Sequence, residues 1–403
     1  MSPGPTDPTI ERVFREVNGQ AVATLVRLFG DVALAEDAVQ DAFAIASSRW
    51  PTEGVPPNPA GWIVTTARNR ATDQLRRAKR GRQLEREVTG TEPEPGEEEP
   101  MPQDQLRLIF TCCHPSLRIE HRVALTLRLL GGLSVEEIAR SFLVSEAAMA
   151  KRLVRARYKI KAAKIPYRVP SDNELPARLG AVLAVLYLIY NTGAAQPERE
   201  SLRADALRLT RSLVSLMPDE PEAAGLLALM VLNESRMPAR WKNGDIVLLR
   251  HQDRLRWRRR LIDEGHRIVR DSLERNRPGP FQLQAAIQAV HCDAPSFGAT
   301  DWPQIVRLYD QLYAVQRSPV VALNRAIAIG EVQGAAAALR LLDDLRGPLD
   351  GYYLMHATRA TLLHSLGDVA EARGAFERAA ELATTEPERR YLREEIDRLD
   401  SPV

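Results

Sequence analysis

The stretch from Leu133 to Lys161 constrains this chain most, because it has the pattern of two helices joined by a tight turn. Ser134 and Glu137 have the spacing of a capping box, and Ser145 can cap the second helix. Apolar residues recur at helical spacing in both helices: Val135, Ile138, Ala139 and Phe142, then Met149, Leu153 and Ala156. The rest of the second helix is basic: Lys151, Arg152, Arg155, Arg157, Lys159 and Lys161. This pattern predicts a helix-turn-helix whose second helix enters a major groove. The alternative is a basic amphipathic helix on the surface.

Length and composition limit the remaining possibilities. A chain of 403 residues predicts about two or three domains, and a net charge of +2 means that nucleic-acid binding must come from local basic clusters. Three cysteines are too few for a secreted disulfide framework, so we expect a reducing cytoplasm. The first residues lack a signal pattern, and the longest apolar run, Leu179 to Tyr190, is too short to span a bilayer. We therefore expect a cytoplasmic protein without membrane contact.

Cys112, Cys113, His114 and His121 suggest a metal site at first sight. Their spacing fits no structural zinc pattern, and neighbouring cysteines cannot easily bind one tetrahedral ion. The pair is expected to be small buried thiols near a helix end, with His114 and Pro115 forming a bend before a helix from Ile119 to Leu130. We predict no metal and no cofactor.

The first ninety residues predict three helices, Thr9–Phe29, Val32–Trp50 and Trp62–Arg86, separated by Gly30-Asp31 and by a loop rich in proline and glycine. The second helix carries an acidic face, which alone would be an ordinary solvated surface. The third helix is strongly basic and begins with a tryptophan. Basic residues with an aromatic ring suit single-stranded or melted nucleic acid, although a lone tryptophan is more often part of a core.

These segments resemble the extracytoplasmic-function class of sigma-70-like RNA polymerase sigma factors. Residues 37–43 match the polymerase-clamp-binding signature D-x-x-Q-[DE]-x-F, which implies a polymerase contact at Asp37, Gln40, Asp41 and Phe43. Residues 62–77 resemble the sigma region that melts and reads the promoter element near the start site, and residues 133–161 resemble the region that reads the element farther upstream. The implied DNA-binding residues are Trp62, Arg68, Asn69, Arg76, Arg77, Ser145, Ala148, Met149, Lys151, Arg152 and Arg155.

The resemblance implies a sigma factor that brings core RNA polymerase to promoter DNA, with no catalysis of its own. It implies a region 2 domain at 1–87, a flexible acidic linker at 88–105 and a region 4 helix-turn-helix domain at 106–168. The linker is rich in proline, glycine and glutamate, so a packed structure is not expected there. In related factors it threads near the RNA path, where acid would mimic RNA; a plain spacer is the alternative. The promoter sequence stays open.

The second half, residues 172–403, predicts helices almost throughout, with glycines 33 residues apart at Gly334 and Gly367. This spacing is typical of tetratricopeptide-like repeats, although generic antiparallel helix pairs would give a similar one. Five segments also resemble a C-terminal extension found on one sigma-factor group: Val185–Ala195, His251–Trp257, Gly279–His291, Thr300–Leu312 and Ser318–Ile329. In that group the extension takes a regulatory role. It can mask the polymerase and DNA surfaces or brace them, and the flexible linker favours bracing.

A polar cluster at His251, Gln252, Asp253, Arg254 and Trp257 could suggest an enzyme, but no phosphate loop, nucleophile elbow or metal pair accompanies it. A structural network is the better interpretation. The predicted fold is all-α, with two small sigma domains and a helical-repeat extension that contacts a protein partner or the rest of the chain. The alternative function is a helix-turn-helix regulator with a helical-repeat sensor domain.

Overall fold

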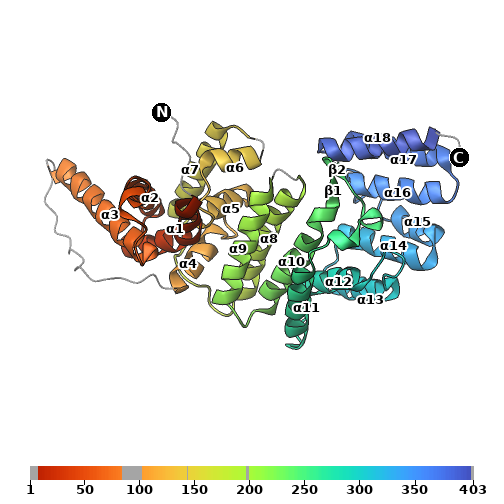
Figure 1. Cartoon of the computed structure of the whole chain (residues 1–403), viewed down its shortest axis with the longest axis horizontal. Coiled ribbons are helices and arrows are strands. Elements are labelled where there is room, and N and C mark those ends of the chain that lie inside the picture. The colour runs from red at the N-terminus through yellow and green to blue at the C-terminus, as the bar shows by residue number, and fades with distance from the viewer. Residues whose placement is uncertain (1–7, 84–101, 143, 197–198, 401–403) are drawn as a thin grey trace. The chain divides into compact units, whose positions relative to one another are not determined.

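The computed structural model describes residues 8–83, 102–142, 144–196 and 199–400, which divide into two compact units, Met1–Leu216 and Met217–Val403. In these residues the chain forms eighteen α-helices and a single two-stranded hairpin (Figure 1). The all-α prediction is therefore confirmed. Most of the predicted acidic linker, residues 88–101, lies outside the described residues.

Unit 1 begins with three long helices at almost the predicted positions: α1 (Pro8–Phe29), α2 (Val32–Glu53) and α3 (Pro59–Gln83). The break between α1 and α2 falls at Gly30, whose φ of 68° favours glycine, and Asp31 then caps α2 by accepting hydrogen bonds from the Ala33 and Leu34 amides. The three helices pack on one another through small and branched apolar residues. Together they form a three-helix bundle at the start of unit 1.

The helix-turn-helix follows, with α4 (Pro102–Cys112), α5 (Ile119–Leu125), the π-helix η1 (Thr126–Leu130), α6 (Val135–Ser141) and α7 (Glu146–Ala162). The capping box is confirmed: the Glu137 amide donates to Ser134 Oγ at 3.1 Å, and the Ser134 amide donates to Glu137 Oε2 at 2.7 Å. The predicted helix from Ile119 to Leu130 is not regular to its end, because its last five residues widen into a π-helix. This extra residue per turn lets the Gly131 amide reach the Thr126 carbonyl.

The next two helices, α8 (Leu175–Ala194) and α9 (Glu200–Leu216), belong to unit 1, whereas the sequence pattern assigns them to the extension. Both contact α4, and α8 also contacts α5. The buried Arg178 donates to the Phe110 carbonyl at 2.9 Å, and Arg208 donates to the Gly131 carbonyl at 3.2 Å. These contacts make α8 and α9 part of the support of the helix-turn-helix.

By length and composition alone, α8 is apolar enough to cross a membrane. Its contacts with α4, α5 and α9, and the hydrogen bond from its buried Arg178, are those of a core helix in unit 1. A buried guanidinium bonded to another helix fits that packing.

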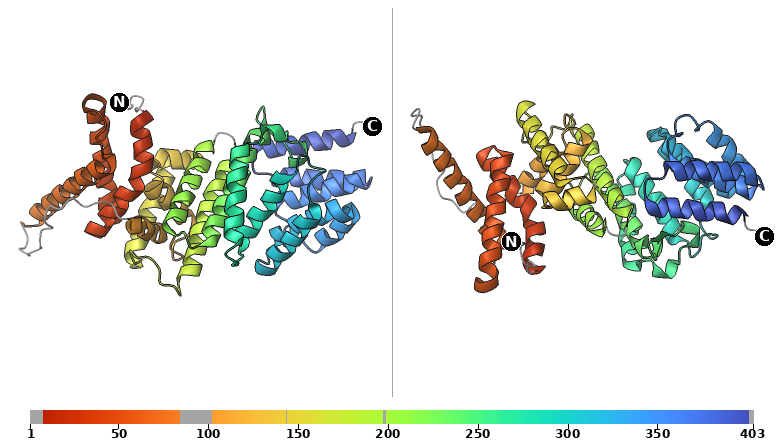
Figure 2. Two further views of the ribbon diagram at one scale, coloured as in Figure 1. Left: turned by 60° about the horizontal axis from the view of Figure 1, so that its bottom comes forward. Right: turned by 90° about the horizontal axis from the view of Figure 1, so that it is seen from above.

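Unit 2 is a stack of helices that pack mainly on their neighbours in sequence (Figure 2). Its elements are α10 (Pro221–Arg240), β1 (Trp241–Lys242), β2 (Asp245–Ile246), η3 (Leu249–His251), η4 (Arg254–Arg256), α11 (Arg259–Leu273), α12 (Pro280–Asp293), α13 (Trp302–Val315), α14 (Pro319–Gln333), α15 (Ala335–Asp343), α16 (Tyr353–Ser365), α17 (Val369–Leu382) and α18 (Glu386–Asp400). The two strands are antiparallel, with Trp241 opposite Ile246. Contacts between successive helices are those of a helical-repeat domain, as predicted.

Gly334 and Gly367 occupy the same place in two successive helix pairs, between α14 and α15 and between α16 and α17. Their φ values are 88° and 86°, and a Cβ atom at either would meet nothing within 4 Å. The glycines are therefore needed because the backbone has a positive φ at both positions. The repeat pattern alone would suggest a different reason, the close approach of paired helices. In the pair formed by α16 and α17, the side chains of Ala360, Ala372 and Phe376 are buried.

Candidate nucleic-acid interface

The predicted polymerase face lies on α2, where Asp37 and Asp41 are exposed and Gln40 is partly exposed. Phe43 differs from the other three: its side chain is 4% exposed, and its ring lies 4.4 Å from that of Phe14 on α1. The prediction that Phe43 itself contacts a partner needs correction, because a buried ring can only hold α2 in place. The exposed part of the face is thus made of two carboxylates and an amide.

The acids on this face influence one another. Burial raises the pKa of Asp37, and the nearby Glu36 and Asp41 carboxylates raise it further, while Arg157 and Arg128 act in the opposite direction. Asp41 accepts a long hydrogen bond from Gln74 on α3 at 3.5 Å. The face is therefore negative and open, with two arginines from other helices close to one end.

The basic helix α3 presents the residues predicted to meet melted DNA. Asn69, Arg76 and Arg77 are exposed, and Arg68 is partly exposed. Trp62 lies at the start of the helix, partly exposed, with its ring 5.4 Å from that of Trp50 in an edge-to-face arrangement. Trp62 thus packs against Trp50 of α2, and this contact restricts the orientation of its ring.

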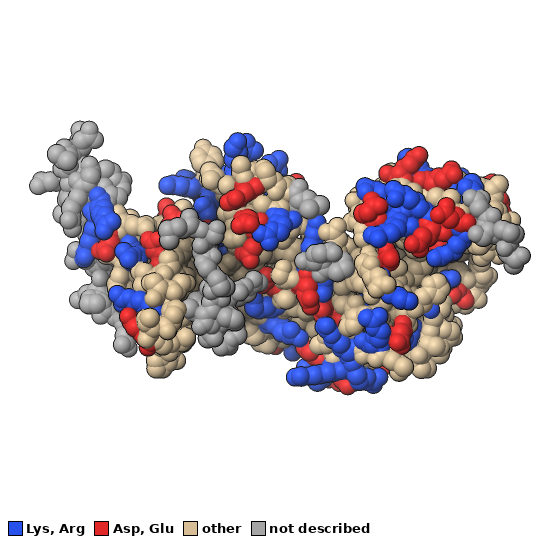
Figure 3. Space-filling model, turned by 45° about the horizontal axis from the view of Figure 1, so that its top comes forward, with Lys and Arg blue, Asp and Glu red and all other residues tan. Residues whose placement is uncertain are grey.

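The second helix of the helix-turn-helix, α7, has an open N-terminus and basic sides. Ser145 caps it by accepting from the Ala148 amide at 3.2 Å, and both residues are exposed. Lys151 and Arg155 are exposed and Arg152 partly so, and Figure 3 shows lysine and arginine side chains on this part of unit 1. Met149 is only 1% exposed, so its predicted DNA contact is corrected to a packing role between α7 and the helices beneath it.

Glu36, which is not among the predicted site residues, joins the two predicted sigma domains. Its carboxylate is 3% exposed and accepts from Arg128 Nε at 2.6 Å and from Arg157 Nη2. Arg128 lies in η1 and Arg157 in α7, whereas Glu36 lies in α2 beside the polymerase face. A buried carboxylate shared by two guanidinium groups is a strong, geometrically specific contact. No motif marks Glu36, because its partners are about 90 and 120 residues away in sequence.

Three further contacts hold the same two domains together. Asn18 Nδ2 on α1 donates to the Leu129 carbonyl at 2.9 Å, and Arg27 Nε on α1 donates to Asp104 Oδ2 on α4 at 2.8 Å. The Tyr167 hydroxyl, after α7, lies 2.6 Å from the Ala23 carbonyl and 3.0 Å from that of Asp104. Burial of this hydroxyl raises the pKa of Tyr167, so it remains protonated. The two predicted sigma domains are therefore packed together and not loosely tethered.

Comparison with known proteins identifies the segments. Family models described as Sigma-70 region 2 and Sigma-70, region 4, match residues 13–81 and 107–160. Uncharacterized protein R00370 of Rhizobium meliloti (strain 1021) is 42% identical over 394 residues, which span 94% of this chain and 93% of that protein. ECF RNA polymerase sigma factor SigM of Bacillus subtilis (strain 168) is 27% identical over 157 residues, 38% of this chain and 94% of that protein.

The chain belongs to the sigma-70 family. It is a sigma factor of the extracytoplasmic-function class with a long C-terminal helical extension. Residues 178–273 of that extension match a family of unknown function, DUF6596. Two solved structures also resemble the chain at 12% identity: yeast Tom70, with a TM-score of 0.39 over 97% of this chain and 85% of that one, and the P58(IPK) TPR domain, with a TM-score of 0.26 over 97% and 98%.

The polar cluster in the extension of this sigma factor is a structural network. Arg254 Nη1 donates to the carbonyls of His291 and Ala294 at 2.6 and 2.5 Å, and its guanidinium lies 4.6 Å from the Trp257 ring centroid. Asp253 caps the short helix η4 by accepting from the Leu255 amide at 3.0 Å. These contacts tie the loop before α11 to the end of α12.

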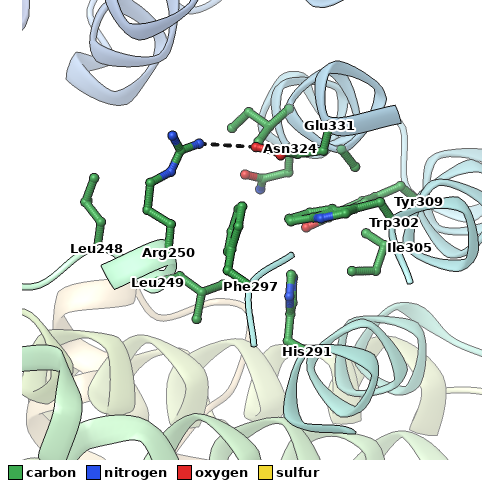
Figure 4. Close-up of a pocket in the computed structure, with 12 residues that line it drawn as sticks. Leu248, Leu249, Arg250, His291, Phe297, Trp302, Ile305, Tyr309, Asn324 and Glu331 are labelled. Atoms are coloured by element: carbon green, nitrogen blue, oxygen red, sulfur yellow. Dashed lines mark hydrogen bonds and ion pairs between the residues drawn. The ribbon is translucent and has the colours of Figure 1, made fainter. Parts of the chain in front are cut away.

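A cavity of about 240 Å³ lies beside this network in unit 2 (Figure 4). Phe297, Trp302 and His291 line it, and Arg250 donates to Glu331 at 3.2 Å along its edge. Burial and nearby arginines lower the pKa of His291 to about 3, so the imidazole is neutral at physiological pH. The guanidinium carbon of Arg250, which also lines the cavity, lies 5.3 Å from the centroid of the Phe297 ring.

The cysteine pair behaves as expected of buried thiols. Cys112 and Cys113 are fully buried and unpaired, and burial raises the pKa of Cys113 to about 11. Such thiols stay protonated and unreactive at neutral pH. Across the described part of the chain, no three His, Cys, Asp or Glu side chains converge on a possible metal position.

Proposed function

We propose that this sigma factor directs core RNA polymerase to specific promoters and that its C-terminal extension supports or regulates that activity. The observation that carries the proposal is the open acidic face of Asp37 and Asp41 on α2, beside two separate basic helices, α3 and α7. One acidic and two basic surfaces suit one protein partner and two DNA elements. The protein supplies sequence selection and strand separation in the cytoplasm, while the polymerase carries out the chemistry.

In this proposal the acidic face of α2 and the basic helices α3 and α7 each bind a different partner. Asp37, Gln40 and Asp41 meet a basic surface of the polymerase, which speeds encounter and sets the register of binding. Trp62 and the α3 residues Arg68, Asn69, Arg76 and Arg77 hold the melted strand. Ser145, Ala148, Lys151, Arg152 and Arg155 meet the upstream element in its major groove.

Two parts of the extension have different proposed roles. Helices α8 and α9 brace region 4 from within unit 1, through Arg178 and Arg208. Helices α10–α18 form the candidate surface for a protein partner or for the rest of the chain. Over α17 and α18 their charges of both signs interleave and pair, as in the contacts of Arg378 with Glu381 and Arg398 with Glu394 (Figure 3). Such mixed charge suits reversible contacts more than nucleic-acid binding.

Binding of the fluorescently labelled full-length chain to purified core RNA polymerase tests the proposal. We expect saturable binding that weakens as salt increases, because the proposed contact pairs an acidic face with a basic one. The alternative, a helix-turn-helix regulator with a sensor domain, predicts promoter binding by the chain alone and no binding to core polymerase.

Arg152 provides a separate prediction for the upstream element. Replacing Arg152 with alanine is expected to weaken promoter binding of the polymerase complex by about 1–3 kcal/mol if the guanidinium contacts a base edge, with relaxed specificity at that base pair. If it contacts only phosphate, all sequences weaken alike and the salt slope falls by about one. Binding of a promoter library at several salt concentrations distinguishes these outcomes. Lys164→Ala, beyond the end of α7, is the control, and an Arg152→Ala variant indistinguishable from it would remove Arg152 from the interface.

A further inference from the structure

The cavity of about 240 Å³ in unit 2 lies between the start of η3, the end of α12, and the helices α13 and α14. Its rings stand edge to face: the ring centroids of Phe297 and Trp302 are 5.2 Å apart, and those of His291 and Trp302 are 5.3 Å apart. Leu248 and Leu249 also line it. An apolar cavity of about 150 Å³ can hold a benzene ring, so this cavity has room for a planar ring system.

His291 adds an unused polar group to this aromatic wall. The residue is only 8% exposed, and its ring points from α12 toward Trp302 and the cavity (Figure 4). No residue in the described part of the chain forms a hydrogen bond with its Nδ1 atom. A buried polar atom without a partner costs free energy, and such atoms are rare in folded proteins. The neutral imidazole therefore has hydrogen-bonding capacity left for a ligand.

The rim of the cavity already holds a carboxylate on an arginine. Arg250 Nη2 donates to Glu331 Oε1 at 3.2 Å, and 45% of the arginine side chain and 27% of the glutamate side chain are exposed (Figure 4). Strong hydrogen bonds between a guanidinium group and a carboxylate are about 2.7–2.9 Å long, so this contact is a weak one. Exposed ion pairs of this kind contribute little to stability. A second carboxylate can therefore replace Glu331 on Arg250 at little cost.

Positive charge exceeds negative charge around the cavity. The charges of Arg250 and Glu331 cancel each other, whereas Arg236 and Arg254 lie close enough to lower the pKa of His291. Arg254 Nη1 donates to two backbone carbonyls, and among the described residues no acid pairs with its guanidinium. The cavity should therefore attract an anion and repel a cation.

We propose that this cavity binds a small aromatic carboxylate, whose ring packs against Phe297 and Trp302 and whose carboxylate takes the place of Glu331 on Arg250. His291 then forms a hydrogen bond with a polar atom of the ligand. The cavity is smaller than the roughly 300–1,000 Å³ of most ligand pockets, which favours a compound of one or two rings over an extended peptide. The site lies wholly within unit 2, so binding there does not require the proposed polymerase contacts of unit 1.

Isothermal titration of the full-length chain with 2-naphthoate tests this assignment. Two compounds of similar shape are the comparisons: 2-naphthamide, which is neutral, and 2-naphthylmethylammonium, which is a cation. We expect 2-naphthoate to bind at one site per chain, about tenfold or more tighter than 2-naphthamide, because a hydrogen bond between charged groups is stronger than one between neutral groups. The cation should bind more weakly than either.

Two substitutions at the rim should change the affinity for 2-naphthoate in opposite directions. Arg250→Gln should weaken binding about tenfold, since it removes the guanidinium that holds the carboxylate. Glu331→Gln should strengthen binding, since it removes the acid that competes for Arg250 and repels the ligand. Both side chains are partly exposed, so both variants are expected to fold.

Arg325→Gln is the matched control. Arg325 on α14 pairs with Asp310 on α13 at 2.6 Å, so this variant also breaks an ion pair on the same helices, but neither residue lines the cavity. Its affinity for 2-naphthoate should equal that of the unchanged chain. His291→Phe keeps a ring beside Trp302 and removes both nitrogens, and should weaken binding about twofold to tenfold. If that variant does not fold, the two rim variants still decide the outcome.

Three results would overturn the proposal. The first is no binding of 2-naphthoate at millimolar concentration, which would mean that the cavity is only a gap in the packing. The second is binding of 2-naphthamide or of the cation as tight as that of 2-naphthoate. The third is equal affinity in Arg250→Gln and Arg325→Gln, which would place the bound 2-naphthoate elsewhere on the chain.

Discussion

Replacing Asp41 with arginine is expected to weaken binding to core RNA polymerase by about 1.5–3 kcal/mol or more, while the fold is retained. Asp41 is exposed, and its one hydrogen bond within the described part of the chain is the long contact with Gln74, so the substitution removes little from the folded state. At the interface it converts an attraction into a repulsion, and contacts with charged groups have this magnitude. Titration of labelled variant into core polymerase measures the effect.

Two comparisons make the Asp41 result specific. Glu53→Arg, at the exposed end of the same helix and outside the proposed face, makes the same change of charge and should bind nearly as the unchanged chain does. Phe43→Ala should instead lower stability by about 3–5 kcal/mol, because it leaves a cavity beside Phe14. Polymerase binding that is equally weak in Asp41→Arg and Glu53→Arg would mean that net charge alone, and not this face, determines affinity.

Truncation after Leu216 is expected to leave a stable protein, whereas truncation after Arg168 is expected to destabilise the sigma half by at least about 3 kcal/mol. The shorter fragment loses the hydrogen bonds that Arg178 and Arg208 make to the Phe110 and Gly131 carbonyls. Each hydrogen bond to a charged group contributes about 1.5–3 kcal/mol, and the apolar surface of α8 that covers α4 and α5 is lost as well. Urea denaturation of residues 1–216 and 1–168 compares the two.

The same two fragments also test whether α8 and α9 are needed for promoter binding. If α8 and α9 brace region 4, residues 1–216 keep promoter binding that residues 1–168 lose. If the two fragments unfold at the same urea concentration, α8 and α9 do not support unit 1, and the boundary near residue 172 that the sequence pattern suggests is the better one.

Local patterns in the sequence predict the helices and most of the exposed site residues. The capping box at Ser134 and Glu137, the break at Gly30-Asp31 and the buried row of Met149, Leu153 and Ala156 all depend on residues within a few positions of each other. Prediction of helices from sequence is most reliable where it depends on such local signals. Asp37, Asp41 and Arg155 became candidates through the resemblance to sigma factors, and all three are exposed.

Contacts between residues far apart in sequence could not be predicted in this way. Phe43 and Met149 belong to motifs, but only packing against α1 and the helices under α7 decides that they face inward. Glu36 has no special neighbours in sequence, and its role depends on two arginines brought to it by the docking of separate domains. The contacts of α8 and α9 with α4 could not be predicted either, because the repeat-like pattern of these two helices does not indicate which surface they cover.

Run-off transcription with purified core RNA polymerase, on the DNA upstream of the gene for this chain, tests whether the chain directs initiation at a promoter. The full-length chain is expected to give a transcript of defined length that depends on both the chain and the promoter, and Asp41→Arg is expected to reduce it about tenfold or more, in step with binding. No defined transcript from the full-length chain or from residues 1–216, although both are folded and the polymerase is active with another sigma factor, would contradict the account.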